Sequence, residues 1–227
     1  NSHSTRLPLD RGGGGFSWRI LNQDKLGICL LHLISNSKID EGKILFHKNF
    51  IFPHSLKKPS EYYSFQLNQE VEFMKEFLNK IINKKDFDVL GQPEYLSSYF
   101  PRLHTNTNGW IDWNLKNIDL FNFICAFDDP YDGASTFYKN KKVKIKSVTW
   151  TRSEQIFHPY QYGMIYRKTN NWIVVAINFG SLIIEEVLNE KKYNIINDLK
   201  IGDRFTTPHK NLENSKLRKY FDSIGLK

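Results

Sequence analysis

Five short apolar segments follow one another between residues 134 and 187, and they are the feature that most restricts the fold. Turn residues such as Lys139-Asn140 and Thr169-Asn170-Asn171 separate them. Short strands at a spacing of roughly 8–12 residues are typical of a small barrel or sandwich. A helix is expected just before them, over residues 115–127, where Asp128-Asp129-Pro130 would end it. The expected strands are residues 134–138, 143–150, 163–167, 172–176 and 182–187.

The first 90 residues carry a different pattern. Residues 27–34 form a continuous apolar run bounded by a glycine and by Ser-Asn, which suits a strand buried on both faces. Residues 43–52 predict a second strand. Apolar residues at helical spacing then predict a helix over residues 68–83, with a core face made of Val71, Met74, Leu78 and Ile81. We therefore predict an α/β domain over residues 1–90, a linker at residues 91–109 and a mainly β module over residues 110–227.

Several classes of protein and of site are excluded by what the chain lacks. Its two cysteines cannot build a disulfide framework or a Cys-rich zinc site. None of its seven histidines stands in an HExxH or other zinc-ligand spacing, so no metal is expected. A mean hydropathy of -0.50 and the absence of a long apolar run argue against a membrane span. With no apolar leader at the start of the chain, a cytoplasmic protein is expected.

The positive charge is concentrated in the second half of the chain. The formal net charge is +8, and residues 101–227 carry 19 basic and 13 acidic side chains. This excess of basic residues favours a polyanionic partner such as RNA or a nucleotide. The alternative is a solvated strand edge that lysines protect from pairing with other chains. The densest run lies between residues 139 and 146: Lys139, Lys141, Lys142, Lys144 and Lys146.

Asn1, His3 and Asp40 supply an amide, an imidazole and a carboxylate, the three side-chain types needed to move a one-carbon acyl group to an amine. The amide of Asn can donate to a developing oxyanion, and an imidazole can donate to the same oxygen or shuttle a proton. A carboxylate can orient the imidazole and help to deprotonate the attacking amine. In Asn1-x-His3 at a strand end both side chains share a face, because alternate residues do so.

A longer pattern around these residues resembles the 10-formyltetrahydrofolate-dependent formyltransferase family. The chain opens Asn1-x-His3-x-Thr5-x-Leu7-Pro8-x-x-Arg11-Gly12, continues through Trp18, Gly27 and His32, and reaches Asp40-x-Gly42. Family members show Asn-x-His-x-Ser-x-Leu-Pro-x-x-Arg-Gly and later Asp-Thr-Gly. Here Thr5 replaces the serine of the first pattern and Glu41 replaces the threonine of the second, and both replacements are tolerable. Further similarity lies in Trp110-Ile111-Asp112-Trp113, in Pro130-Tyr131-x-Gly133-Ala134 and in Gly202-Asp203-Arg204-Phe205. The family includes methionyl-tRNA formyltransferase and nucleotide-sugar N-formyltransferases.

The resemblance implies a role for each matching position. Asn1, His3 and Asp40 would be the catalytic set, without a metal. The stretch lying against the folate would be Thr5, Arg6, Leu7 and Pro8, and the formyl acceptor would meet Arg11, Trp18 and Tyr131. The fold would be the C-terminal half of a Rossmann-like formyltransferase domain followed by a small OB-like β-barrel module. About 100 residues that precede the catalytic Asn in the family have no counterpart here, so we expect a fragment or a partner chain that supplies them.

Three functions follow from this resemblance and stay open at this point. The first is transfer of the formyl group from 10-formyltetrahydrofolate to the amine of a nucleotide-linked amino sugar. The second is formylation of initiator methionyl-tRNA, which the basic second half favours. The third is a catalytically silent module that binds sugar or RNA. Expected partners are a small-molecule amine or nucleotide sugar, tRNA, and a second copy of the chain in a homodimer; no membrane is expected.

Overall fold

The structure, a computed structural model, describes residues 1–13, 15–34, 40–152 and 155–221. It divides into two compact units, unit 1 over Asn1–Arg102 and unit 2 over Leu103–Lys227. Each unit has its own sheet, and each is described below by itself.

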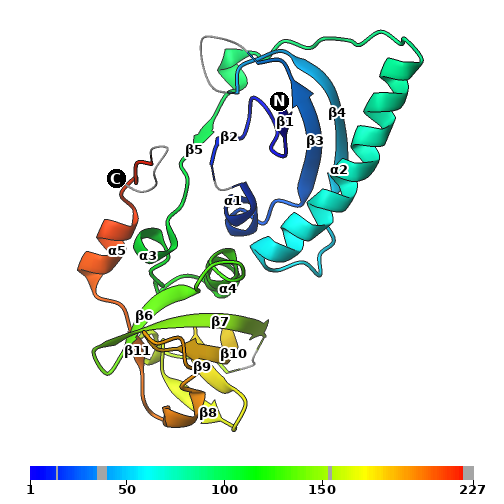
Figure 1. Cartoon of the computed structure of the whole chain (residues 1–227). Coiled ribbons are helices and arrows are strands. Elements are labelled where there is room, and N and C mark those ends of the chain that lie inside the picture. Colours follow the sequence, from blue (N-terminus) through cyan, green and yellow to red (C-terminus); the bar gives the residue numbers. More distant parts are fainter. Residues whose placement is uncertain (14, 35–39, 153–154, 222–227) are drawn as a thin grey trace. The chain divides into compact units, whose positions relative to one another are not determined.

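Unit 1 contains a three-stranded sheet in the order β1-β3-β4 (Figure 1). Both pairings are antiparallel, and β3 lies in the middle with most of its side chains buried. The two strands expected from apolar runs are confirmed, although the first ends two residues early. The strands are β1 (Ser2–His3), β3 (Leu26–His32) and β4 (Ile44–Ile51).

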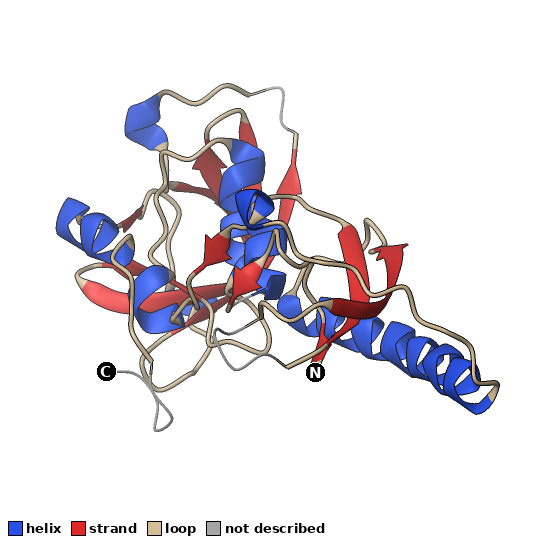
Figure 2. Cartoon of the chain, turned by 90° about the horizontal axis from the view of Figure 1, so that it is seen from above, coloured by secondary structure: helices blue, strands red, loops and turns tan. Residues whose placement is uncertain are grey.

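The long helix of unit 1, α2 (Pro59–Ile82), packs against β3 and β4 and is the long straight helix of Figure 2. Proline stands at its first turn, and Glu61 accepts a hydrogen bond from the Lys58 backbone N–H at 3.0 Å, which caps the start. The helix therefore begins nine residues before the predicted start. Its buried residues are Pro59, Tyr62, Gln66 and Phe73.

The predicted core face of this helix is wrong. Val71, Leu78 and Ile81 are 54%, 50% and 48% exposed, respectively. The reason is that α2 carries a second apolar stripe, rich in aromatic residues, which packs against aromatic rings on β4 and just after it. Phe73 stacks on Phe46 with ring centroids 5.0 Å apart, and Tyr62 lies 4.6 Å from Phe52.

Shorter elements complete unit 1, and several fall where a linker was expected. They are β2 (Arg11–Gly12), α1 (Gly15–Leu21), the 3₁₀ turn η1 (Glu94–Leu96) and β5 (Tyr99–Phe100). Strand β5 pairs with β2 in parallel, so residues 99–100 belong to the unit that contains the start of the chain. Residues 91–109 are thus not a bare linker.

Unit 2 is built on a six-stranded antiparallel sheet in the order β11-β6-β7-β10-β9-β8. All five strands expected from the turn spacing are present. Its core is formed by aliphatic side chains of the central strands, among them Ile145, Val175 and Ile184, which are fully buried. The strands are β6 (Ala134–Tyr138), β7 (Lys141–Thr151), β8 (Ile165–Lys168), β9 (Ile173–Ile177), β10 (Gly180–Leu188) and β11 (Phe205–Thr206).

The two outer strands of this sheet meet each other. Three backbone hydrogen bonds join residues 163–165 to residues 202–205: Ile165 N–H to the Asp203 carbonyl, Gly202 N–H to the Ile165 carbonyl and Phe205 N–H to the Gly163 carbonyl, at 2.8–3.0 Å. The sheet therefore curls back on itself, as Figure 1 shows.

Four of the five lysines of the run lie in β7, and Lys139 lies in the turn just before it. Strand β7 is an inner strand of the sheet, between β6 and β10. The interpretation of this run as a guarded strand edge is therefore wrong. Lys142, Lys144 and Lys146 share one face of β7, opposite the buried Val143 and Ile145.

The helices of unit 2 are α3 (Thr105–Asn108), α4 (Asn117–Ala126) and α5 (His209–Ser215), with 3₁₀ turns η2 (Pro159–Gln161) and η3 (Ile196–Asp198). Helix α4 packs on β7 and ends just before Asp128-Asp129-Pro130, as predicted. Among the described residues of the whole chain, no helix is long and apolar enough to cross a membrane.

Candidate active site

Antiparallel pairing of β1 with β3 brings Asn1, His3 and His32 to one face of the sheet. Asn1 and His32 are opposite one another: His32 N–H donates to the Asn1 carbonyl at 3.0 Å, and the Asn1 main-chain nitrogen donates to the His32 carbonyl at 2.8 Å. His3 is paired with Leu30, two residues before His32, so His3 and His32 point the same way. Their rings meet edge to face with centroids 5.9 Å apart.

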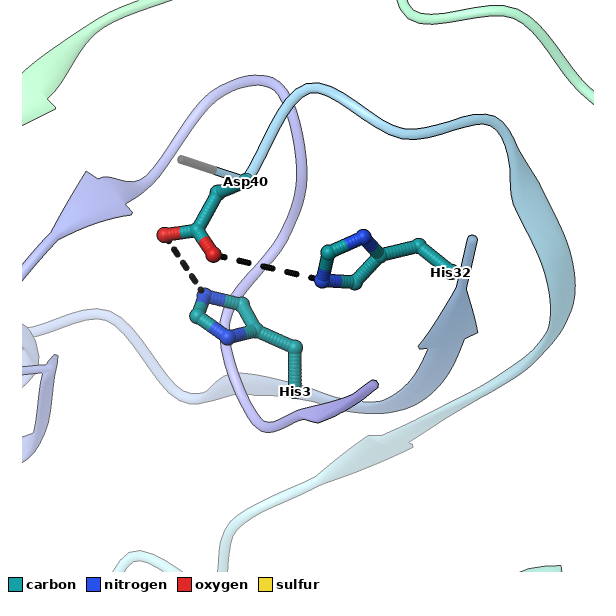
Figure 3. Close-up of side chains that lie close together, drawn as sticks. All are labelled: His3, His32 and Asp40. Atoms are coloured by element: carbon teal, nitrogen blue, oxygen red, sulfur yellow. Dashed lines mark ion pairs between the residues drawn. The ribbon is translucent and has the colours of Figure 1, made fainter. Parts of the chain in front are cut away.

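Asp40 reaches this face from the loop between β3 and β4. Its carboxylate lies between the two imidazoles, with Oδ2 at 3.7 Å from His3 Nε2 and Oδ1 at 3.9 Å from His32 Nε2 (Figure 3). Both distances exceed hydrogen-bond length, so the carboxylate acts on the rings through its charge. The expected grouping of Asn1, His3 and Asp40 is therefore present, and His32 joins it.

The His3 ring is held neutral, and its Nε2 makes no hydrogen bond among the described residues. Burial lowers its pKa below the ordinary value of 6.5; the Asp40 charge opposes that shift and His32 adds to it. Nε2 of His3 is buried and has no hydrogen-bond partner among the described residues. A buried polar atom without a hydrogen bond is uncommon in folded proteins, which makes Nε2 of His3 a candidate for contact with a substrate atom.

Gln92 holds the turn that carries Asp40. Its side-chain amide donates to the Asp40 carbonyl at 2.9 Å and to the Gly42 carbonyl at 2.7 Å. Its Oε1 accepts from Arg11 Nη2 at 3.2 Å, which orients the amide. Gly42 is buried, and a Cβ there would lie 1.5 Å from the Leu33 carbonyl oxygen, so only glycine fits. Asp40 itself has a φ of 62°, in the left-handed region, which these contacts hold in place.

The residues expected to lie against a folate make internal contacts. Leu7 belongs to a buried cluster with Ile28, Leu30 and Ile44, and Pro8 beside it is buried. Thr5 Oγ1 donates to the Asp10 carbonyl at 2.8 Å. Arg6 Nε donates to the Asp10 carboxylate at 2.8 Å, and Arg6 also pairs with Asp24. Folate contact at these four positions stays a prediction.

A cavity of about 110 Å³ lies beside this segment in unit 1. It is lined by Thr5 and Arg6, which were predicted to contact the folate, and by Arg11 and Trp18, which were predicted to contact the formyl acceptor. Polar groups there already have partners within the unit: Arg11 Nη1 donates to Glu94 at 2.9 Å, and Trp18 Nε1 donates to the Pro101 carbonyl at 2.8 Å. Tyr131, the third predicted acceptor residue, is an exposed residue of unit 2.

His3, His32 and Asp40 also have the donor types of a metal site, since one atom from each lies within 4.8 Å of the others. Sequence motifs with zinc-ligand spacing did not reveal this group, because strand pairing and the loop after β3 bring together residues that are far apart in the sequence. Yet Nε2 of His32 is also 3.1 Å from the Asn1 amide nitrogen, so a cation would have to displace that contact. An amide is already the partner of this nitrogen.

Comparison with known proteins shows what the chain is similar to. Residues 104–201 match the family described as formyl transferase, C-terminal domain. The bifunctional polymyxin resistance protein ArnA of Wigglesworthia glossinidia brevipalpis is 29% identical over 81% of this chain and 25% of its own length. Methionyl-tRNA formyltransferase of Mycoplasma capricolum is 27% identical over 90% of this chain and 66% of its own length.

A solved structure shares the fold. WlaRD, a sugar 3N-formyl transferase solved with dTDP and 5-N-formyl-THF, matches 84% of this chain and 65% of its own, with a TM-score of 0.58 and 23% identity. The present chain thus spans a quarter to two thirds of the proteins it matches. Residues 104–201 match the C-terminal domain of the formyl transferases, and the chain is similar to formyltransferases over most of its length.

Proposed function

We propose that this chain transfers a formyl group from 10-formyltetrahydrofolate to the primary amine of a nucleotide-linked amino sugar. One observation carries the proposal: Asn1, His3 and Asp40 converge at the β1–β3 edge, with a neutral His3 whose Nε2 makes no hydrogen bond among the described residues. These are an oxyanion donor, a proton carrier and a carboxylate in one place. The proposal also takes unit 1 as the end of a Rossmann-like domain and unit 2 as an OB-like barrel, which the curled sheet supports.

The residues of this chain divide the work as follows. The co-substrate brings the formyl carbon, and its own nitrogen leaves when the new bond to the amine forms. Asn1 donates an amide N–H to the carbonyl oxygen as negative charge builds on it. The His3 imidazole, neutral near pH 7, lies on the same face and moves a proton between the reacting nitrogens. Asp40 stabilises, through its negative charge, the imidazolium that forms transiently while His3 carries the amine proton to the departing folate nitrogen.

Charge pairing in unit 2 favours a small acceptor over tRNA. Lys139 pairs with Asp203 at 3.0 Å, Lys144 pairs with Asp132 at 3.5 Å, and Lys146 pairs with Asp129. Three of the five lysines in the run are thus already paired with aspartates. Phosphate contacts of a large nucleic-acid interface need lysines whose charge is free for release of counterions.

The test is a formyl-transfer assay with 10-formyltetrahydrofolate and either a dTDP-linked amino sugar or initiator methionyl-tRNA. We expect turnover of the amino sugar. His3→Ala and Asp40→Asn should each lower kcat by at least ~10² with the fold intact. His47→Ala, at an exposed histidine on β4, is the matched control and should keep wild-type turnover.

Two other results would redirect the assignment. Turnover of methionyl-tRNA alone, with salt-dependent tRNA binding, would identify the second candidate. A chain that neither binds nor turns over the formyl-folate, even together with a partner chain that supplies the preceding residues, would be the silent binding module.

A further inference from the structure

His32 is buried and its protonation pattern is dictated by its neighbours. Its side chain is 4% exposed, and its Nδ1 lies 2.9 Å from the Leu33 carbonyl oxygen. A carbonyl oxygen can only accept a hydrogen bond, so Nδ1 must carry the proton. In the neutral imidazole, Nε2 is then an unprotonated acceptor.

That acceptor faces the side chain of Asn1. The Asn1 Nδ2 atom lies 3.1 Å from His32 Nε2, whereas the Asp40 carboxylate oxygen is beyond hydrogen-bond range at 3.9 Å. A lone pair on Nε2 can pair only with the NH₂ end of the amide and not with its oxygen. His32 therefore decides which way round the Asn1 amide sits, and it engages one of the two amide N–H groups.

Two features of the backbone hold this arrangement. Asn1 and His32 face each other across β1 and β3, so their side chains start from adjacent positions. Gly42 packs against the Leu33 carbonyl, and a Cβ there would also lie 3.3 Å from His32 Nδ1. The missing side chain at position 42 leaves the space in which the Leu33 carbonyl accepts from the ring.

We propose that His32 is a positioning residue: as the neutral Nδ1–H tautomer it holds the Asn1 amide so that the second amide N–H is free to donate to the reacting oxygen. The inference deepens the proposed formyl transfer and rests on it. His32 acts through Asn1, without itself touching the substrate. It gives the oxyanion donor a fixed direction before the substrate arrives, which is the condition under which such a donor is most effective.

The first measurement is made on the wild-type protein and needs no activity. Long-range ¹H–¹⁵N NMR at pH 7.5 should show His32 as the Nδ1–H tautomer. It should also show a cross-strand contact between the His32 ring and the Asn1 NH₂ protons. A charged His32 or the Nε2–H tautomer would overturn the proposal, whatever the chain catalyses.

The second measurement uses variants in the transfer assay. His32→Leu removes the acceptor and should lower kcat by about 10- to 100-fold, with KM for the formyl-folate little changed. His32→Gln offers an amide oxygen near the place of Nε2 and should recover activity to within a few-fold of wild type. Equal losses in the Leu and Gln variants, or a loss carried by KM, would refute the positioning role.

A double-mutant cycle separates positioning through Asn1 from an independent role. In an Asn1→Ala background, His32→Leu should cost almost nothing further, because the group that His32 positions is gone. Additive losses would mean that His32 acts on the reaction by another route, and the proposal would fall. If wild type transfers no formyl group, the proposed function fails while the NMR result still decides the state of His32 and Asn1.

Discussion

The contact between Gln92 and the turn of residues 40–42 can be tested on its own. Gln92→Leu keeps the volume of the side chain and removes its bonds to the Asp40 and Gly42 carbonyls, at 2.9 and 2.7 Å, and its acceptor for Arg11. A hydrogen bond contributes about 0.5–1.5 kcal/mol net, and the partly exposed site lets water replace part of this. We therefore expect a loss of about 2 kcal/mol, confined to the turn.

Hydrogen exchange read by mass spectrometry measures this loss directly. Local opening that becomes easier by about 2 kcal/mol speeds amide exchange about 30-fold. The increase should be confined to peptides covering residues 40–46, with α2 unaffected. Asn68→Ala, at an exposed position on α2, is the matched control and should change neither region. Unchanged exchange over residues 40–46 in Gln92→Leu, or a uniform increase across unit 1, would refute the reasoning.

Three further predictions follow from single positions. Burial lowers the folded-state pKa of His3 below 6.5, so the unfolded chain binds more protons than the folded chain just below that pH. The free energy of unfolding should therefore fall as the pH drops below about 6.5. Urea titrations of His3→Asn should show a weaker dependence of this free energy on pH. Burial, aided by Glu70 and opposed by Lys48, raises the pKa of Cys29 to about 12, so a thiol reagent at pH 8 should label Cys29 only after unfolding; native labelling within minutes would contradict this. Gly42→Ala should lower Tm by several degrees and disturb the His32–Leu33 contact, whereas Gly91→Ala, with open space around it, should be neutral by the same thermal melt.

Strand prediction succeeded in unit 2 because the signal there is local. Apolar residues on β6 to β10 alternate or run together between turn residues, and each strand pairs with a neighbour close in sequence. The helix face in unit 1 failed for the opposite reason. Both stripes of α2 are apolar, and only the aromatic rings of Phe46 and Phe52, outside the helix, decide which stripe is buried.

The site divides in the same way. Asn1, His3 and Asp40 could be recognised from their spacing and the surrounding motif. His32 was visible in that motif, but its contact with Asn1 depends on the register of two strands. Gln92 gave no signal at all, because it reaches the turn from a segment about fifty positions further along the chain. Contacts of that kind are set by tertiary packing, and no local pattern encodes them.

The closure of the unit 2 sheet has a consequence for the growing chain on the ribosome. The outer edge of β8 finds its partner only when residues 202–205 have been made. At roughly 5–20 residues per second, that edge waits about 2–7 s with its backbone groups unpaired. A polypeptide released before residue 202 would keep two open strand edges around an aliphatic core, the form of this unit most prone to join other chains edge to edge.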